Sequence, residues 1–380
     1  MRLRYDPARS IRPQWSSPLL LVVPVGLIVA ITLVDINTPA TIPFGPFLVA
    51  APAIAASFAG PGETAMIGAL AVAAQVLLSH VQGGVMTSPH QAQLGALVVI
   101  SALVTVLRYA TDRHLRRLSL VRSVAVAAQE VLLRPLPGRV GPLCIASVYH
   151  AAQEEAQIGG DLYAAVRVEG ATRLVIGDVR GKGLSAVGDA SVLIGAFRGS
   201  AYCNLSLPGV AAHLGNAVYW NWIHSGEDSQ ETWESFVTAL VLDVYDESCV
   251  AGMVNCGHPP PLLVHGTEIT TLEATDPAPP LGLDMVSECD FTAGMFYFED
   301  GDLLLLYTDG VTEARDSTGT FYPLPARLAA WKGSTAQSLV RYLQADLLQH
   351  VGGRINDDVA IVAITRAATI PGAQQRRTAC

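Results

Sequence analysis

A long N-terminal stretch of this chain is almost free of charged side chains. No Asp, Glu, Lys or Arg occurs between Arg12 and Asp35, and Glu63 alone interrupts the stretch between Asp35 and Arg108. Charged residues return at ordinary density after Arg108. The surface of a soluble domain is rich in charged side chains, so a soluble domain rarely runs this far without one. The sequence therefore predicts an apolar N-terminal third that sits in a lipid bilayer, followed by a globular remainder.

The apolar third contains four runs that we interpret as transmembrane helices. A spanning helix needs about 17 to 25 mostly apolar residues. The first two runs meet that length, whereas the last two need flanking polar residues to reach across. A buried core helix is the alternative for the short runs, and a cleaved signal peptide is the alternative for the first. The predicted spans cover residues 18–35, 41–60, 64–80 and 91–107.

Arginines flank the predicted membrane region on both sides. The positive-inside rule then places the N-terminus and the C-terminal domain in the cytoplasm, which requires an even number of spans. Four spans satisfy this condition, and so do two spans with re-entrant segments. We expect a multi-pass protein of the cell membrane. The arginines are Arg2, Arg4, Arg9 and Arg12 before the region, and Arg108, Arg113, Arg116, Arg117 and Arg122 after it.

A segment without Gly or Pro, Tyr109–Leu133, follows the membrane region and is predicted to form one helix. Its apolar residues recur at spacings of three and four over two heptads. The helix either packs on the C-terminal domain or pairs with the same helix of a second chain in a homodimer. We assign residues 1–107 to the membrane region, 108–137 to this linker helix, 138–366 to a globular domain and 367–380 to a flexible tail.

The globular domain reads as strands interrupted by helices. Turn-forming pairs such as Asp300-Gly301 separate short apolar runs. Helices are predicted over 184–198, 208–223, 323–331 and 335–349. This order predicts an α+β domain, a β-sandwich flanked by helices, rather than a Rossmann alternation. The predicted strands are Leu143–Tyr149, Leu162–Val168, Arg173–Asp178, Phe236–Val244, Val250–Asn255, Pro261–Val264, Asp302–Tyr307 and Val359–Thr365.

Acidic residues lie at the edges of four apolar strands: Asp161, Asp178, Asp309 and the pair Asp357-Asp358. Burying a carboxylate there is costly unless a positive group meets it. Mg²⁺ and Mn²⁺ prefer oxygen ligands and would relieve the repulsion among gathered carboxylates. Two such ions about 3.5–4 Å apart can activate a water molecule for attack on a phosphoryl group. The pattern therefore predicts a two-metal hydrolytic site.

Three other chemistries find less support. Gly181-Lys182-Gly183 lacks the spacing and the Ser or Thr of a Walker phosphate loop. The chain has a net charge of −9 and lysines only at Lys182 and Lys332, so it offers no basic stripe for nucleic acid. The six cysteines show no CxxC spacing, which disfavours structural zinc and fits a reduced cytoplasmic domain.

Taken together and in order, five motifs resemble the bacterial sporulation-type branch of the metal-dependent protein phosphatase 2C family, whose members include regulators of sigma factors. The resemblance covers residues 129–366. It implies a phosphatase 2C-like fold that removes phosphate from phosphoserine or phosphothreonine in a protein, such as a phosphorylated anti-sigma-factor antagonist. The motifs are Gly159–Tyr163, Gly177–Gly183, Asn255–Pro261, Leu305–Ala314 and Asp357-Asp358.

The resemblance also implies a site that holds two Mn²⁺ or Mg²⁺ ions. By the family pattern, Asp178 bridges both ions and the backbone carbonyl of Val179 joins one of them. Asp309 and Asp357 complete the shell of the other ion, and Asp161 acts through water. Asp178 and Asp309 are then the expected catalytic residues.

Two positions depart from the family pattern. Ala164 stands where a second acid often follows the Gly-Gly-Asp-x-Tyr motif, and Arg180 stands where the eukaryotic branch has a histidine. The general acid for the leaving oxygen therefore stays unassigned. Asp358 is a second-rank ligand candidate, and His258 is interpreted as part of a structural turn. The alternatives to an enzyme are a catalytically silent membrane sensor or adaptor that keeps the fold, and a transporter with a regulatory tail.

Overall fold

The computed structural model describes residues 18–38, 44–81, 88–151, 159–181, 183–224 and 236–366. The chain divides into two compact units, Met1–Leu120 and Val121–Cys380. The division falls inside helix α4, Ser88–Leu132, which is continuous through most of the predicted linker helix. The predicted tail, residues 367–380, lies outside the described residues.

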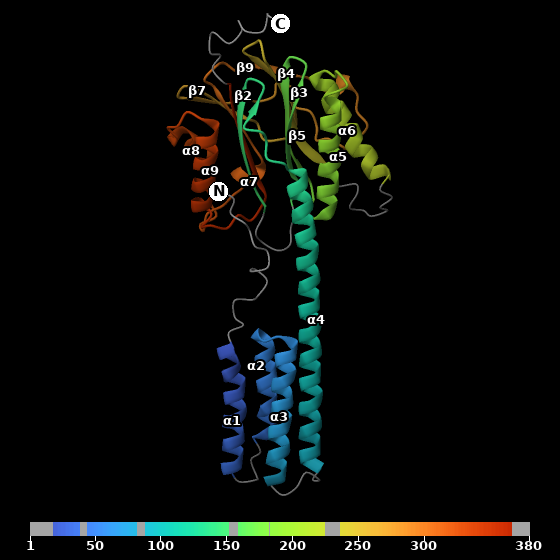
Figure 1. The fold of residues 1–380 in the computed structure, drawn as a ribbon, viewed down its shortest axis with the longest axis vertical. Helices are drawn as coiled ribbons and strands as arrows, with labels where there is room; N and C mark the ends of the chain where they lie inside the picture. Colours follow the sequence, from blue (N-terminus) through green and yellow to red (C-terminus); the bar gives the residue numbers. More distant parts are fainter. Residues whose placement is uncertain are drawn as a thin grey trace, which may run out of the picture. The chain divides into compact units, whose positions relative to one another are not determined.

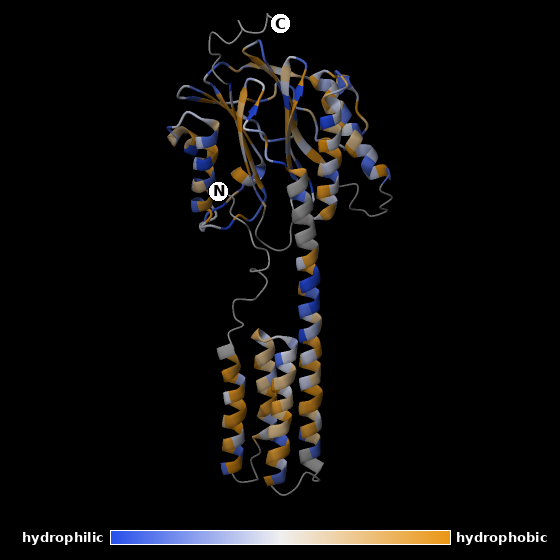
Figure 2. Cartoon of the chain, in the orientation of Figure 1, coloured by the Kyte–Doolittle hydropathy of each residue, from blue (hydrophilic) through white to orange (hydrophobic). Residues whose placement is uncertain are grey.

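The first unit is built from apolar helices. Figure 2 shows hydrophobic residues over much of α1, α3 and the first part of α4. Small and branched side chains such as Ala55, Ile67 and Ala71 fill its interior. Its elements are the 3-10 helix Pro18–Leu21, α1 (Val22–Asn37), the 3-10 helix Gly45–Val49, α2 (Ala50–Phe58), α3 (Pro61–Val81) and the N-terminal part of α4 (Figure 1).

Two of these helices are long and apolar enough to cross a membrane. They are Pro61–Val81, with 21 residues, and the Gln91–Leu120 part of α4, with 30 residues. Val22–Asn37 and Gly45–Phe58 are shorter apolar helices. The sequence predicted the opposite, with the first two runs long enough to span a membrane and the last two short. The described part of the second run is a 3-10 helix followed directly by the nine residues of α2, whereas α4 extends through polar residues on both sides of its apolar run.

Hydrogen bonds satisfy several polar groups within the first unit. The Gln75 side-chain amide donates to the Gln93 carbonyl at 3.1 Å, and Arg108 Nε donates to the backbone carbonyl of Ala59 at 2.9 Å. Asp35 is buried and accepts from the backbone N–H of Phe44 at 2.5 Å. Polar side chains in an apolar bundle need such partners, since an unpaired polar group there is costly.

The second unit contains two antiparallel sheets. The first sheet has the strand order β1-β2-β11-β10-β7-β8, and the second has the order β3-β4-β5-β6-β9. The strands of the first sheet are β1 (Arg139–Val140), β2 (Leu143–His150), β7 (Leu262–His265), β8 (Glu268–Thr271), β10 (Leu303–Tyr307) and β11 (Val359–Arg366). Those of the second are β3 (Asp161–Val168), β4 (Ala171–Val179), β5 (Val237–Tyr245), β6 (Val250–Cys256) and β9 (Gly294–Tyr297).

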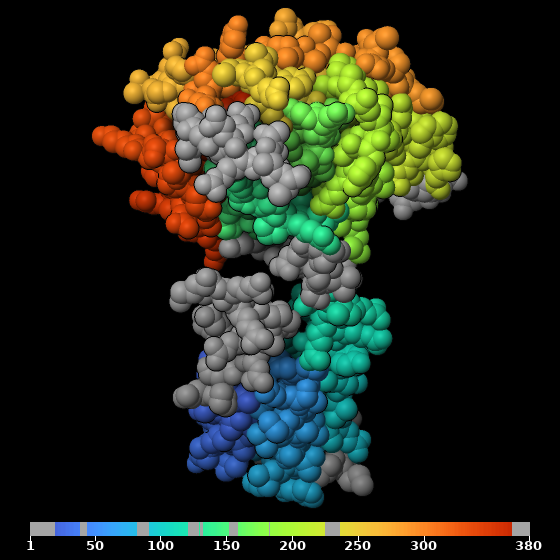
Figure 3. Space-filling model, turned by 45° about the horizontal axis from the view of Figure 1, so that its top comes forward, coloured from blue at the N-terminus to red at the C-terminus, as the bar shows by residue number. Residues whose placement is uncertain are grey.

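Helices cover the outer faces of the two sheets. Helices α5 (Leu184–Ser200) and α6 (Leu207–His224) pack on the second sheet, and α9 (Ala336–His350), with α8 (Leu324–Ala330) beside it, packs on the first (Figures 1 and 3). The described residues of this unit also include the short 3-10 helix Glu288–Asp290 and α7 (Asp309–Thr312). The predicted α+β fold, a sandwich of sheets flanked by helices, is confirmed.

Strand β10 shows why its sequence is apolar at every position. Leu304 and Leu306 belong to the core between the sheets, whereas Leu303, Leu305 and Tyr307 face the second core under α8 and α9. Because successive side chains alternate between faces, a strand buried on both faces reads as a continuous apolar run. Burial on both faces holds β10 in place, and Asp309 lies two residues after its last residue, Tyr307.

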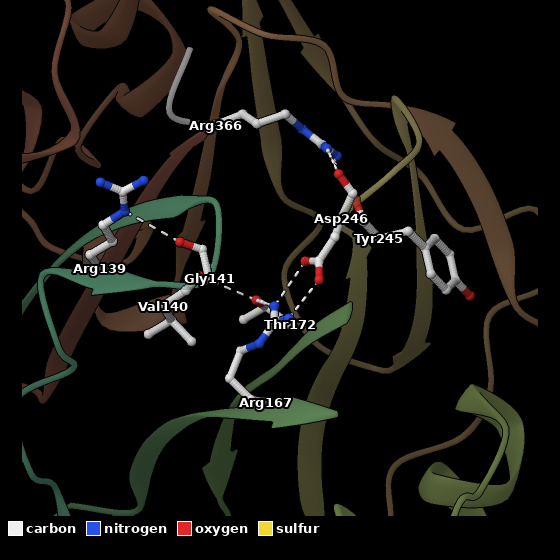
Figure 4. Close-up of polar contacts among 8 residues, drawn as sticks. All are labelled: Arg139, Val140, Gly141, Arg167, Thr172, Tyr245, Asp246 and Arg366. Atoms are coloured by element: carbon white, nitrogen blue, oxygen red, sulfur yellow. Dashed lines mark hydrogen bonds and ion pairs between the residues drawn. The ribbon is translucent and has the colours of Figure 1, made fainter. Parts of the chain in front are cut away.

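Arg173 and Asp243 are direct partners on neighbouring strands of the second sheet, and their side chains form a buried ion pair. Arg173 Nε and Nη2 each lie 2.7 Å from a carboxylate oxygen of Asp243, and both side chains are 5% exposed. Figure 4 shows a similar two-bond pair in an open setting, where Arg167 donates to Asp246 at 2.8 and 2.5 Å. There the two side chains are 40% and 25% exposed.

We expect the substitution Asp243→Ala to lower the free energy of unfolding by about 3–5 kcal/mol, because it leaves a buried guanidinium without its counter-charge. The matched substitution Asp246→Ala removes an exposed partner and should cost about 1 kcal/mol or less. Thermal unfolding of the full chain in detergent measures both. Equal destabilisation by the two substitutions would contradict the assignment of the Arg173 pair as buried.

Candidate metal centre

Three carboxylates gather at one end of the sandwich. One oxygen from each of Asp161, Asp178 and Asp309 lies within 4.8 Å of the others. Asp161 opens β3 and pairs directly across the ladder with Asp178 near the end of β4. Asp309 opens α7 after β10 of the other sheet. The cluster therefore joins the two sheets, and residues nearly 150 positions apart meet because both sheets end here.

Thr308 connects the sheets through its hydroxyl. Its Oγ1 donates to the Asp161 carboxylate at 2.7 Å and accepts from the backbone N–H of Ala360 at 2.9 Å. Its own N–H donates to the carbonyl of the same residue, Ala360, at 3.1 Å. The sequence analysis assigned no role to Thr308. A threonine beside an Asp-Gly pair carries no signal by itself, since the contact depends on a strand far away in the chain.

The carboxylates repel one another in this arrangement. The pKa of Asp161 is raised well above its usual value, chiefly by burial and then by the charges of Asp178 and Asp358, while the Thr308 hydrogen bond opposes the shift. The pKa of Asp309 is also raised, by burial and by the nearby charges of Glu313 and Asp357. Bringing like charges together in a partly buried site is unfavourable unless a cation neutralises them.

The remaining predicted ligands lie around this cluster. Asp357 is exposed and close enough to raise the pKa of Asp309, but it is not one of the three carboxylates that lie within 4.8 Å of one another. The Val179 carbonyl faces Gly160, where a Cβ would lie only 2.2 Å from the oxygen. Gly160 in turn accepts from the Val179 N–H at 3.2 Å. The assignment of these groups as ligands stays a prediction.

The other positions singled out in the sequence have local structural roles. Ala164 is buried in the core, where an acidic side chain would be costly. His258 is also buried, and burial lowers the pKa of its imidazole to about 3. The Asn255 side chain accepts from the His258 N–H at 2.8 Å and donates to its carbonyl at 2.9 Å, as in a fixed turn. Arg180 Cζ lies 5.1 Å from the centre of the Phe236 ring.

The family described as stage II sporulation protein E (SpoIIE) matches residues 168–367, which is more than half of the chain. The chain belongs to the SpoIIE family. The match takes in Asp178, Asp309 and Asp357, and the earlier Asp161 pairs with Asp178 in the structure. The predicted relationship to sporulation-type phosphatases 2C is confirmed for this part of the chain.

Curated relatives of this SpoIIE-family chain include two phosphoserine phosphatases of Bacillus subtilis. RsbP is 33% identical over 181 residues, which are 47% of this chain and 41% of RsbP. RsbU is 24% identical over 212 residues, which are 55% of this chain and 60% of RsbU. The matched segments thus span less than two thirds of either relative.

A solved structure supports the fold. The SiaA phosphatase 2C domain of Pseudomonas aeruginosa superposes with a TM-score of 0.53 at 15% identity, and the match covers 67% of this chain and 98% of that domain. At this identity the likeness concerns the architecture alone. The second unit therefore has the phosphatase 2C fold that the motif order predicted.

Proposed function

We propose that this protein is a protein phosphatase that hydrolyses phosphoserine or phosphothreonine at a two-metal site. The observation that carries the proposal is the group of three carboxylate oxygens, from Asp161, Asp178 and Asp309, within 4.8 Å of one another. Hard oxygen donors at this spacing suit Mg²⁺ or Mn²⁺. Membership of a family whose relatives RsbU and RsbP are phosphoserine phosphatases supports the same reaction.

The chain's own residues fit such a centre. Asp178 is the cross-strand partner of Asp161 and shares the carboxylate cluster with Asp309 from the end of the other sheet, so we assign it as the residue that would hold both ions. Asp309 and Asp357 would hold one ion, and the Val179 carbonyl would join the other, with Asp161 oriented by Thr308. When bound, the two ions would supply an activated water for in-line attack on phosphorus. These residues would position the ions, and the positive charge of the ions would offset the repulsion among the carboxylates that helps to raise the pKa of Asp161.

We also propose that the first unit anchors the enzyme in the cell membrane, with the N-terminus and the phosphatase domain in the cytoplasm. Two helices of sufficient length and apolar character and the arginines on both flanks support the anchor. A phosphorylated protein, such as an anti-sigma-factor antagonist, is the proposed substrate. A catalytically silent adaptor is the second candidate, but the retained carboxylates favour the enzyme.

The test is hydrolysis of p-nitrophenyl phosphate and of a phosphoserine peptide by the full chain in detergent. We expect turnover in the presence of Mn²⁺ or Mg²⁺ and its loss on addition of EDTA, with recovery when metal is restored. Mn²⁺ binding without turnover of either substrate would favour the silent adaptor. Turnover that persists in EDTA would contradict the two-metal site.

A further inference from the structure

Three hydrogen-bonded side chains run from the end of helix α4 toward the acid cluster; Gln129 and Asp358 are buried, and Tyr149 between them is partly buried. Gln129, in the last turn of α4, donates from Nε2 to the Tyr149 hydroxyl at 2.6 Å and to the Gly159 carbonyl at 3.2 Å. The Tyr149 hydroxyl donates to Asp358 Oδ2 at 2.9 Å. Gln129 and Asp358 are each 4% exposed. These hydrogen bonds join residues from α4, from β2 and from the position directly before β11, and none of these elements carries the three clustered carboxylates.

The Asp358 carboxylate occupies a fixed space beside the motif that leads to Asp161. A Cβ on Gly159 would lie 1.2 Å from Asp358 Oδ2, so only glycine permits this approach. The backbone carbonyl of Asp358 also lies close to the segment that follows Asp309, since a Cβ on Gly310 would be 1.8 Å from its oxygen. Asp358 thus contacts the chain on both sides of the cluster, through its carboxylate at Gly159 and through its backbone carbonyl at Gly310.

The Tyr149 phenol is suited to hold this carboxylate. Burial and the charges of Asp358 and Asp161 raise the pKa of Tyr149, so the phenol keeps its proton and remains a donor. A neutral donor fixes the direction of a carboxylate without adding charge to the site. Gln129 supplies the second constraint, because its amide holds the phenol and the Gly159 carbonyl at the same time.

We propose that Tyr149, supported by Gln129, is a positioning residue of the metal centre that orients Asp358 and the Gly159-Gly160-Asp161 segment. Its hydroxyl hydrogen-bonds to Gln129 and Asp358, so it would act on the cluster through Asp358. This inference rests on the proposed function. Supporting residues around metal ligands typically change metal affinity or activity by about 10–100-fold when they are replaced.

The test compares two tyrosine variants of the full chain in detergent. Tyr149→Phe removes the hydroxyl that holds Asp358. Tyr322→Phe is the matched control, because Tyr322 also donates to an aspartate, Asp346, at 2.7 Å, on the α8 and α9 side of the domain. We measure the Mn²⁺ dissociation constant by calorimetry, kcat and KM for p-nitrophenyl phosphate, and the thermal midpoint in EDTA.

We expect Tyr149→Phe to weaken Mn²⁺ binding by about tenfold and to lower kcat by a similar factor, with KM almost unchanged and a thermal midpoint in EDTA close to that of Tyr322→Phe. Gln129→Leu should show the same pattern and serves as the second variant if Tyr149→Phe does not fold. Mn²⁺ affinity and kcat equal to those of Tyr322→Phe in both variants would overturn the inference while leaving the phosphatase intact. A parent chain that neither binds Mn²⁺ nor hydrolyses phosphate would instead overturn the proposed function.

Discussion

The substitution Asp178→Asn is expected to reduce Mn²⁺-dependent phosphate hydrolysis by more than about a hundredfold. Replacing a residue that only supports a ligand already costs about 10–100-fold, and Asp178 is the proposed bridge itself. It pairs with Asp161 across β3 and β4 and shares the cluster with Asp309, so no neighbouring carboxylate replaces its position. The measurement is kcat/KM for p-nitrophenyl phosphate at saturating Mn²⁺.

A matched control separates the loss of this carboxylate from a general loss of acidity. Asp246→Asn alters an aspartate that directly follows β5 and pairs with Arg167, and we expect its activity to stay within about twofold of the parent chain. Nearly full activity of Asp178→Asn, at the Mn²⁺ concentration that saturates the parent, would remove Asp178 from the mechanism.

The second large effect is expected for Gly310→Ala. A Cβ at this position would lie 1.8 Å from the backbone oxygen of Asp358 and 2.9 Å from its carbonyl carbon. Because backbone atoms cannot rotate away as a side chain does, the strand and α7 must separate. We expect a loss of about 3 kcal/mol in stability, at the upper end of overpacking effects. At about 2–4 °C per kcal/mol, the thermal midpoint should fall by roughly 6–12 °C, and Mn²⁺-dependent activity should be lost.

Gly195→Ala is the control for this substitution. Gly195 lies in α5 and a Cβ there would meet nothing within 4 Å, so alanine should stabilise the helix by about 0.5–1 kcal/mol. Thermal unfolding in detergent, together with hydrolysis assays, measures both variants. If Gly310→Ala unfolds at the same temperature as the parent chain and retains its activity, α7 and Asp358 do not pack as closely as the structure shows.

The central strands were predictable because burial leaves a direct mark in the sequence. The run Leu303–Tyr307 is apolar at every position, since both of its faces are buried, and the predicted strand begins only one residue early. The strands β1, β8 and β9 were not predicted. They are two to four residues long and all lie at sheet edges, where partly exposed side chains leave no continuous apolar run.

The membrane region and the carboxylate cluster were each predicted only in part, for two different reasons. Apolar composition marked the four helical runs, but it did not give the length of the last helix, because α4 continues through polar residues that hydropathy does not count as part of a span. The acidic motifs indicated which carboxylates to consider. The contacts of Thr308, Tyr149 and Gln129 join residues far apart in the chain, and only the paired sheets bring them together.

The most direct test is a crystal structure of the protein grown with Mn²⁺, recorded at the manganese absorption edge. The proposal predicts two anomalous peaks about 3.5–4 Å apart, with a carboxylate oxygen of Asp178 in contact with both and Asp309 in contact with one. A map with no anomalous peak among Asp161, Asp178 and Asp309 at saturating Mn²⁺ would contradict it and leave only the fold.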